Sequence, residues 1–310
     1  MTLDQLRIFI AVADREHLTG AAEALNMTPS AVSHAIRALE ERHGAELFHR
    51  VGRRIELAEA GRVFLPAAKA TLAQAQSAEL ALAELGGMKR GRLAVHASQT
   101  IASYWVPELL VRFHDAYPGV YVSLAVGNTT EAVRAVVEGS ADVGFVEGDV
   151  DEPVLAMKSV ASDQLIVVVS PDHHWADGRL LKPDDLRHGR WVMREQGSGT
   201  RALFEDALEA IGIPRQELDV SLSLPSNEAV RAAVQAGKLA GVMSEMVAAN
   251  DLEAGRLARA GIDLPARMFW MLWHKERYRT KAARALEALI PKPSRENPAQ
   301  RSKTPRAPRH

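Results

Sequence analysis

Three short segments of the chain combine hydroxyl, amide and glycine residues in a way that suits anion binding. They are Ser98-Gln99-Thr100, Gly127-Asn128-Thr129-Thr130 and residues 195–201, Glu-Gln-Gly-Ser-Gly-Thr-Arg. Each precedes a predicted helix, whose N-terminus exposes unpaired N–H groups and the positive end of the helix dipole. Three such ends that converge would bind an anion. For any one of these loops taken alone, capping of its own helix is the more ordinary explanation.

No pattern in the sequence indicates a catalytic centre or a metal site. The chain has no cysteine, which excludes disulfides, thiolate nucleophiles and Cys-ligated zinc. Residues 197–201 lack the Gly-Lys-Ser/Thr ending of a nucleotide-binding P-loop, and H-E-x-x-H and G-x-S-x-G are absent. His173 and His174 lie in a turn-like stretch, where exposure to solvent is the ordinary explanation. We therefore expect no catalytic residue, no metal and no cofactor.

Strands and helices alternate along the part of the chain that contains these loops. The expected strands are 92–97, 120–126, 141–146, 164–169, 191–193, 219–224 and 268–273, and the expected helices are 101–117, 130–138, 200–211, 227–236 and 280–289. This alternation predicts a parallel sheet covered by helices on both faces, with ligands beyond the carboxyl ends of the strands. Residues 226–228 are expected to begin another helix that faces this cleft.

A pair of helices joined by a tight turn is predicted for residues 18–41. Asn26 suits the left-handed conformation of a turn, Met27 is expected to fill the corner, and Thr28 followed by Pro29 begins the second helix. That helix would bury Val32, Ile36 and Leu39 and expose Ser30, Ser33, His34 and Arg37. Such a pair either inserts its polar face into a DNA major groove or is an αα-hairpin with a solvated face.

The following residues favour the DNA-binding interpretation. Residues 47–57 alternate apolar and polar side chains around Gly52, which is typical of a two-stranded wing with arginines at its tip. The predicted DNA contacts are Thr28, Pro29, Ser30, Ser33, His34, Arg37, Arg50, Arg53 and Arg54. The overall net charge of -1 does not exclude them, because a local positive face decides such binding.

The N-terminal sequence resembles that of LysR-type transcriptional regulators. The matching residues are Ala21-Ala22, Leu25, Thr28, Ser30-Ala31-Val32-Ser33, Ile36, Leu39-Glu40, Gly44, Leu47-Phe48, Arg50, Arg53, Leu57 and Ala60-Gly61. Ala58 stands where the family usually has Thr, which weakens the cap of the next helix. The resemblance implies an N-terminal all-α winged helix-turn-helix, a long linker helix, and a two-lobed α/β effector domain like periplasmic binding proteins, with strands crossing between the lobes.

These observations predict a division of the chain into domains. Residues 1–58 form the winged helix-turn-helix, 59–87 the linker and dimerisation helix, 88–290 the effector domain and 291–310 a disordered basic tail. Within the effector domain, lobe I spans about 91–160 and 267–290, and lobe II spans about 161–266. In the linker, Leu65, Ala68, Leu72, Ala75 and Leu82 follow the spacing of a helix-pairing seam. The alternative is a helix that packs on its own domain.

Four motifs, at 98–107, 127–129, 139–148 and 194–201, resemble the LysR branch that regulates sulfur assimilation and carbon fixation. That branch senses small anionic metabolites between the lobes. The resemblance therefore implies effector contacts from Ser98, Thr100, Asn128, Thr129, Glu147, Gly199, Thr200 and Arg201. Glu147 would accept a hydrogen bond from the ligand or would instead be held by other residues of the fold.

The expected function is that of a transcriptional regulator whose binding to promoter inverted repeats is modulated by a small anion. The expected partners are double-stranded DNA, the anion and further copies of the chain in a homodimer or homotetramer, with RNA polymerase a further candidate. We expect no membrane span and a cytoplasmic location, because the N-terminal residues favour a packed helix over a signal peptide. The alternatives are a constitutive DNA-binding protein and, more remotely, an anion-handling enzyme.

Overall fold

The structure is a computed structural model that describes residues 1–51, 54–83 and 91–291. The predicted wing arginine Arg53, the end of the predicted linker at 84–87 and nearly all of the predicted basic tail lie outside the described residues.

The N-terminal region contains the predicted helix pair and wing. Its elements are α1 (Leu3–Ala13), α2 (Leu18–Ala24), α3 (Pro29–His43), β1 (Phe48–Val51) and β2 (Arg54–Leu57), the two strands pairing antiparallel. The predicted turn is confirmed, since Asn26 has a φ of 53° and Thr28 Oγ1 accepts a hydrogen bond from Ala31 N at 3.2 Å. The prediction for Met27 is wrong, because this side chain is 37% exposed and does not fill the corner.

A long helix, α4 (Glu59–Ala83), connects the winged region to the rest of the chain. Phe64, Leu65 and Ala68 pack into the core of the winged region, whereas Ala73 lies against lobe I. Leu82 is exposed. The predicted apolar stripe is therefore divided, and the half nearer the N-terminus packs on its own domain, as the alternative held.

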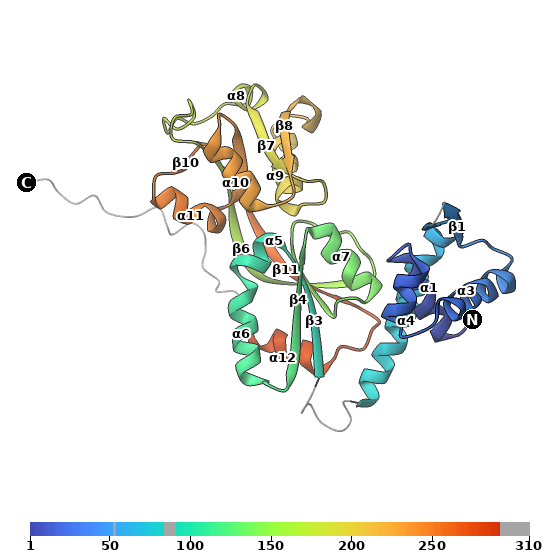
Figure 1. Ribbon diagram of the computed structural model, residues 1–310. Coiled ribbons are helices and arrows are strands. Elements are labelled where there is room, and N and C mark those ends of the chain that lie inside the picture. Colours follow the sequence, from blue (N-terminus) through green and yellow to red (C-terminus); the bar gives the residue numbers. More distant parts are fainter. Residues whose placement is uncertain (52–53, 84–90, 292–310) are drawn as a thin grey trace, which may run out of the picture.

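The remainder of the chain folds around one mixed sheet with strand order β4-β3-β5-β11-β6-β9-β7-β8, and β10 pairs with β6. The strands are β3 (Gly91–Ser98), β4 (Val120–Gly127), β5 (Val143–Glu147), β6 (Leu155–Val169), β7 (Arg190–Arg194), β8 (Asp219–Leu224), β9 (Ala240–Ser244), β10 (Ala258–Arg259) and β11 (Ala266–His274). The prediction of a purely parallel sheet is wrong at the centre, where β6 and β11 pair antiparallel and cross between two lobes (Figure 1). The pattern of apolar and polar residues does not encode strand direction, so it could not predict the antiparallel pairing of β6 and β11.

Helices cover both faces of each lobe. Lobe I has α5 (Gln99–Tyr104), α6 (Val106–Ala116), α7 (Thr129–Glu138) and α12 (Lys281–Leu289), and lobe II has α8 (Pro183–Arg187), α9 (Gly199–Ala210), α10 (Asn227–Ala236) and α11 (Glu245–Glu253). The single helix predicted over 101–117 is wrong: the chain breaks at Trp105, two residues before Pro107, whose missing N–H cannot continue a helix.

Each lobe has its own apolar core. Phe113, Phe145 and Phe269 are fully buried in lobe I, and Trp191 and Phe204 are fully buried in lobe II. Within the described ranges, no helix is both long and apolar enough to cross a membrane.

Candidate functional site

The helix α3 presents a polar face on the side opposite its buried residues. Val32, Ile36 and Leu39 are buried, as predicted. The residues predicted to contact DNA from this helix and its start lie on the other side, where Thr28, Pro29, Ser30, His34 and Arg37 are exposed and Ser33 is half-buried. Arg37 Nη2 donates to Ser33 Oγ at 3.2 Å, so these two side chains form one hydrogen-bonding unit.

The wing is attached to α3 by a contact that the sequence analysis did not predict. Glu40 Oε1 accepts hydrogen bonds from Leu47 N at 2.8 Å and Phe48 N at 3.3 Å. A groove lies between α3 and the wing, with Arg37 and Arg50 among its lining residues. Arg50 and Arg54 are exposed and make no ion pair with any described residue, so their guanidinium groups are available to phosphates.

The three polar loops converge where the lobes meet. Asn128 Nδ2 of lobe I donates to Glu195 Oε1 of lobe II at 3.4 Å, and Thr130 N donates to Gly197 O at 3.3 Å. Ser98, Thr100 and Thr200, the hydroxyl residues predicted for this site, are buried. The predicted convergence is confirmed, and it brings buried hydroxyl groups from both lobes together where the lobes meet.

The capping alternative applies to some of these residues but not to others. Asn128 caps α7, since its Oδ1 accepts from Glu131 N at 3.0 Å. Ser98 and Ser198 stand at the N-caps of α5 and α9 and make no capping bond. Ser98 Oγ donates instead to the carboxylate of Glu147. The Ser98 hydroxyl is therefore bonded to Glu147 and not to the N–H groups at the start of α5.

Glu147 is held by residues of both lobes and is 2% exposed. Besides the bond from Ser98, its Oε1 accepts from Thr200 Oγ1 at 3.5 Å, and its main-chain oxygen accepts from Thr129 Oγ1 at 3.0 Å. Gly199 lies so close that a Cβ there would be 2.3 Å from the same main-chain oxygen. Glycine at this position thus permits α9 to approach lobe I.

A buried guanidinium at the cleft, that of Arg267, was missed by the sequence analysis. Its Nε donates to Asp163 Oδ2 at 2.8 Å, its Nη1 donates to Thr200 Oγ1 at 2.9 Å, and Nη1 lies 3.6 Å from Glu147 Oε1. The only sequence signal was a charged residue at the start of the apolar run 268–273. Its partners are 67 or more positions away, and the register of β11 against β6 places Asp163 opposite it.

The helix predicted to begin at 226–228 is confirmed as α10, and its first residue, Asn227, contacts lobe I. Asn227 Nδ2 donates to Thr100 Oγ1 of lobe I at 3.1 Å, and its Oδ1 accepts from Arg194 Nη1 at 2.8 Å. Arg194 also pairs with Glu195 at 2.8 Å. Burial opposes ionisation of Glu195, but the hydrogen bonds and charge of Arg194 outweigh it and lower its pKa below the ordinary value. This pair is therefore charge-balanced.

Arg201 lies apart from this group. Its Nε donates to Glu205 Oε1 at 2.7 Å and its Nη1 donates to Arg194 O at 3.0 Å, both within lobe II. The expectation for His173 is corrected, because this side chain is buried: its Nδ1 accepts from Trp175 N at 3.1 Å, and it packs in the tight turn that precedes Trp175. His174 is exposed, as expected.

Comparison with known proteins decides the family. Residues 3–62 match the model described as bacterial regulatory helix-turn-helix protein, lysR family, and residues 86–292 match the LysR substrate binding domain. The chain belongs to the LysR family of transcriptional regulators. The family assigns DNA binding to the N-terminal region and ligand binding to the two-lobed region.

This LysR regulator is similar to proteins of known sequence and structure. It is 34% identical over 287 residues to a probable RuBisCO transcriptional regulator of Cyanidioschyzon merolae, covering 91% of this chain and 95% of the relative. Full-length CbnR solved with its target DNA aligns with a TM-score of 0.65 at 24% identity, covering 94% and 99% of the two chains. The regulatory domain of Synechocystis PCC6803 CcmR, solved in complex with 2-PG, aligns with a TM-score of 0.59 at 26% identity, covering 65% and 96%.

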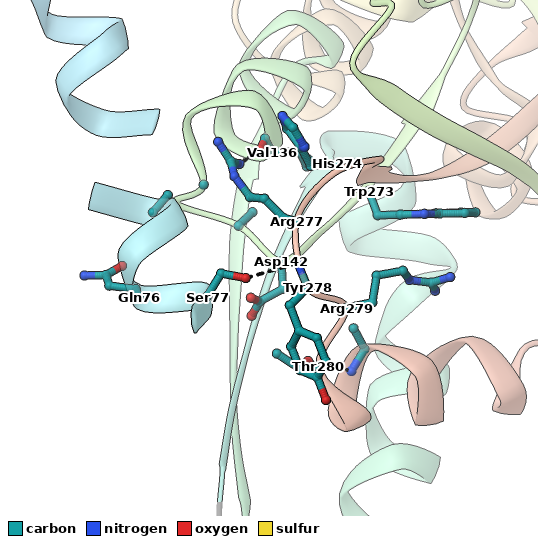
Figure 2. A pocket seen from close by; sticks show the side chains of 14 residues that line it. Gln76, Ser77, Val136, Asp142, Trp273, His274, Arg277, Tyr278, Arg279 and Thr280 are labelled. Carbon is teal, nitrogen blue, oxygen red and sulfur yellow. Dashed lines mark hydrogen bonds between the residues drawn. The ribbon is translucent and has the colours of Figure 1, made fainter. Parts of the chain in front are cut away.

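In this LysR regulator the linker helix contacts the effector domain at a cavity, shown in Figure 2. Ser77 Oγ of α4 accepts from Tyr278 N at 3.1 Å, and Arg277 donates to the carbonyl oxygen of Val136 at 2.6 Å. Burial lowers the pKa of Arg277. Lys69 lies 3.2 Å from Asp14 of the winged region and 3.4 Å from Glu138 of lobe I. The helix α4 is thus bonded to both the winged region and lobe I.

Proposed function

We propose that this LysR regulator binds promoter inverted repeats as a homodimer or homotetramer, and that a small anionic metabolite in the interlobe cleft modulates this binding. The observation that carries the proposal is the meeting of buried hydroxyl groups from both lobes, those of Ser98, Thr100 and Thr200, beside the guanidinium of Arg267. Hydroxyl and guanidinium donors in a water-poor site are suited to oxyanions.

The DNA contacts come from α3 and the wing. Ser30, Ser33, His34 and Arg37 would read base edges from the major groove, Thr28 and Pro29 would lie at the helix start near the backbone, and Arg50, Arg53 and Arg54 would neutralise phosphates. The exposure of this face and the unpaired state of Arg50 and Arg54 support the assignment. Two recognition helices that bind two half-sites together have a higher affinity for DNA than one helix alone, and this favours an oligomer.

The effector contacts combine the predicted residues with those added by the tertiary structure. We assign them to Ser98, Thr100, Asn128, Thr129, Gly199 and Thr200, together with Arg267 and Asn227. Glu147, which was predicted with them, is left out of this set because its carboxylate already accepts hydrogen bonds from Ser98 and Thr200. Arg201 is a weaker candidate, because its described bonds lie within lobe II. The complex of the CcmR regulatory domain with 2-PG supports a small-molecule ligand for this type of domain.

The linker helix α4 is proposed as the dimerisation element. Its exposed apolar side chains Val63 and Leu82 are available for a second copy. Contact with RNA polymerase stays a prediction, as does the division of the chain at residues 58 and 87. A ligand acts on the DNA-bound assembly only by its difference in affinity between two arrangements of the subunits.

A metabolite screen tests the proposal. Purified full-length protein is melted with sulfate, phosphate, 2-PG and small carboxylates, since a ligand of the folded state raises the melting temperature. The bound anion is then tested for its effect on promoter binding in Thr100→Val and Thr200→Val. We expect both variants to lose the response and to retain DNA affinity. Equal anion binding by the wild type and both variants would place the ligand elsewhere, and no ligand at all would favour the constitutive alternative.

A further inference from the structure

The hydroxyl and guanidinium donors of the cleft already contact an anionic group of the chain itself, the carboxylate of Glu147. Ser98 Oγ, Thr200 Oγ1 and Arg267 Nη1 all face the Glu147 carboxylate, the last two at 3.5 Å and 3.6 Å from Oε1. These groups come from β3, α9 and β11, which are far apart in the sequence. A carboxylate surrounded by hydroxyl and guanidinium donors occupies the position that suits an oxyanion ligand.

We propose that Glu147 is a built-in competitor of the effector: the anionic group of the ligand replaces the Glu147 carboxylate on Ser98, Thr200 and Arg267. This inference rests on the proposed function, because it concerns the same cleft. The proposal also defines the ligand class. The ligand carries an oxyanion group, no larger than a carboxylate, sulfate or phosphate, at the position that contacts these donors.

The charges of the cluster favour exchange over addition. Two carboxylates, those of Glu147 and Asp163, face the single guanidinium of Arg267, and all three residues are buried. Arg194 does not alter this balance, because it pairs with Glu195. An anion added beside both carboxylates would place three negative groups against one positive group where water is scarce, which is costly. An anion that replaces Glu147 keeps the original balance.

Glu147 also connects the two lobes. Ser98 ends β3 in lobe I, and Thr200 lies in the first turn of α9 in lobe II, so one carboxylate bridges them. Because Glu147 is buried, it reaches solvent only when the lobes separate. The bridge therefore closes the ligand-free cleft, and its release is a required step before the effector binds.

The substitution Glu147→Gln tests the competition, because it keeps the side-chain size and removes the charge. Calorimetry on the full chain with phosphate, sulfate and 2-PG as probes should show that the variant binds the preferred anion about tenfold tighter, or more, than the wild type does. Asp251→Asn is the matched control. It removes a buried carboxylate that pairs with Arg231 and Arg256 on lobe II, and it should leave the anion affinity unchanged. Equal or weaker binding by Glu147→Gln overturns the proposal.

The bridge is tested separately by the distance between the lobes. Because the chain has no cysteine, Arg134→Cys on α7 and Ala210→Cys on α9 introduce unique spin-label sites at exposed positions. With labelled protein diluted into unlabelled protein, Glu147→Gln should lengthen the label distance in the absence of ligand. Thr200→Val, which removes the lobe II donor to Glu147, provides the same measurement if Glu147→Gln does not fold.

The two proposals fail in different ways. A longer distance in Glu147→Gln without binding of any anion to either protein supports the bridge and overturns the anion effector. Binding of an anion to the wild type, with neither distance nor affinity changed in Glu147→Gln, overturns the competitor and leaves the proposed function intact.

Discussion

Arg267 and Asp163 lie directly opposite each other on the antiparallel strands β11 and β6, and their side chains form a buried ion pair. The two strands are the ones that pass between the lobes. Ser244 Oγ, at the end of β9, donates to the other oxygen of Asp163 at 2.9 Å. The pair therefore fixes the register at the crossing, next to the cleft that it helps to build.

Removal of one partner of this pair should destabilise the protein. Arg267→Met leaves Asp163 buried without its guanidinium, a change that typically costs about 3–5 kcal/mol. Urea unfolding followed by circular dichroism gives the difference. The control is Arg259→Met, which breaks a solvent-exposed pair with Glu245 and should have a much smaller effect. Equal effects of the two variants would contradict the structural role of Arg267.

The attachment of the wing to α3 should depend on Glu40. Glu40→Ala leaves the N–H groups of Leu47 and Phe48 without their acceptor, which should cost about 1–3 kcal/mol. Promoter affinity should fall as well, because the wing arginines lose their position. Glu41→Ala, at an exposed position on the same helix, is the control. The role of Glu40 is refuted if both variants unfold at the same urea concentration.

The wing arginines should contribute equally to the affinity for all DNA sequences. Arg50→Ala and Arg54→Ala each remove a phosphate contact, so affinity should fall for promoter and random duplex together, and the slope of log K against log salt should decrease by about 1 for each. Titrations at several salt concentrations measure both quantities. Arg112→Ala, an exposed arginine on α6 of lobe I, should change neither. An unchanged slope would mean that these arginines do not contact DNA phosphates.

The polar face of α3 should instead determine sequence preference. Ser33→Ala and His34→Ala are expected to reduce discrimination between the operator and mutated operators by about 1–3 kcal/mol for each lost base contact. Competition binding against a set of single-base operator variants measures the preference. If both variants discriminate as the wild type does, α3 does not read the groove.

Acid should weaken the native state through His173. Burial lowers the pKa of His173 below the ordinary 6.5, and the charge of His174 lowers it further. Since the unfolded chain takes up the proton first, stability is unaffected above pH 6.5 and is lost as the pH falls from there through the folded pKa. Urea unfolding at about pH 7.5 and about pH 5.5 should show a smaller loss in His173→Asn than in the wild type. His114→Asn, at an exposed position, should retain the full loss.

The sequence alone was enough to predict elements with local signals. Asn26, Thr28 and Pro29 specify a turn and a helix start through their own backbone preferences, and Val32, Ile36 and Leu39 specify a buried face through their spacing. The polar loops around Ser98, Asn128 and Thr200 were predicted to converge because the carboxyl ends of parallel strands meet at one edge. These inferences need only interactions within a few residues or a general rule of sheet topology.

The tertiary structure decided what depends on contacts between distant positions. The antiparallel register of β6 and β11 places Arg267 opposite Asp163 across 104 positions, and the closure of the lobes brings Thr200 to Glu147 across 53. Hydrophobic periodicity records which side of a strand is buried and not which strand lies beside it. For this reason the sequence identified the hydroxyl residues and Glu147, whereas only the fold revealed Arg267 and the contacts by which Glu147 already occupies the hydroxyl donors.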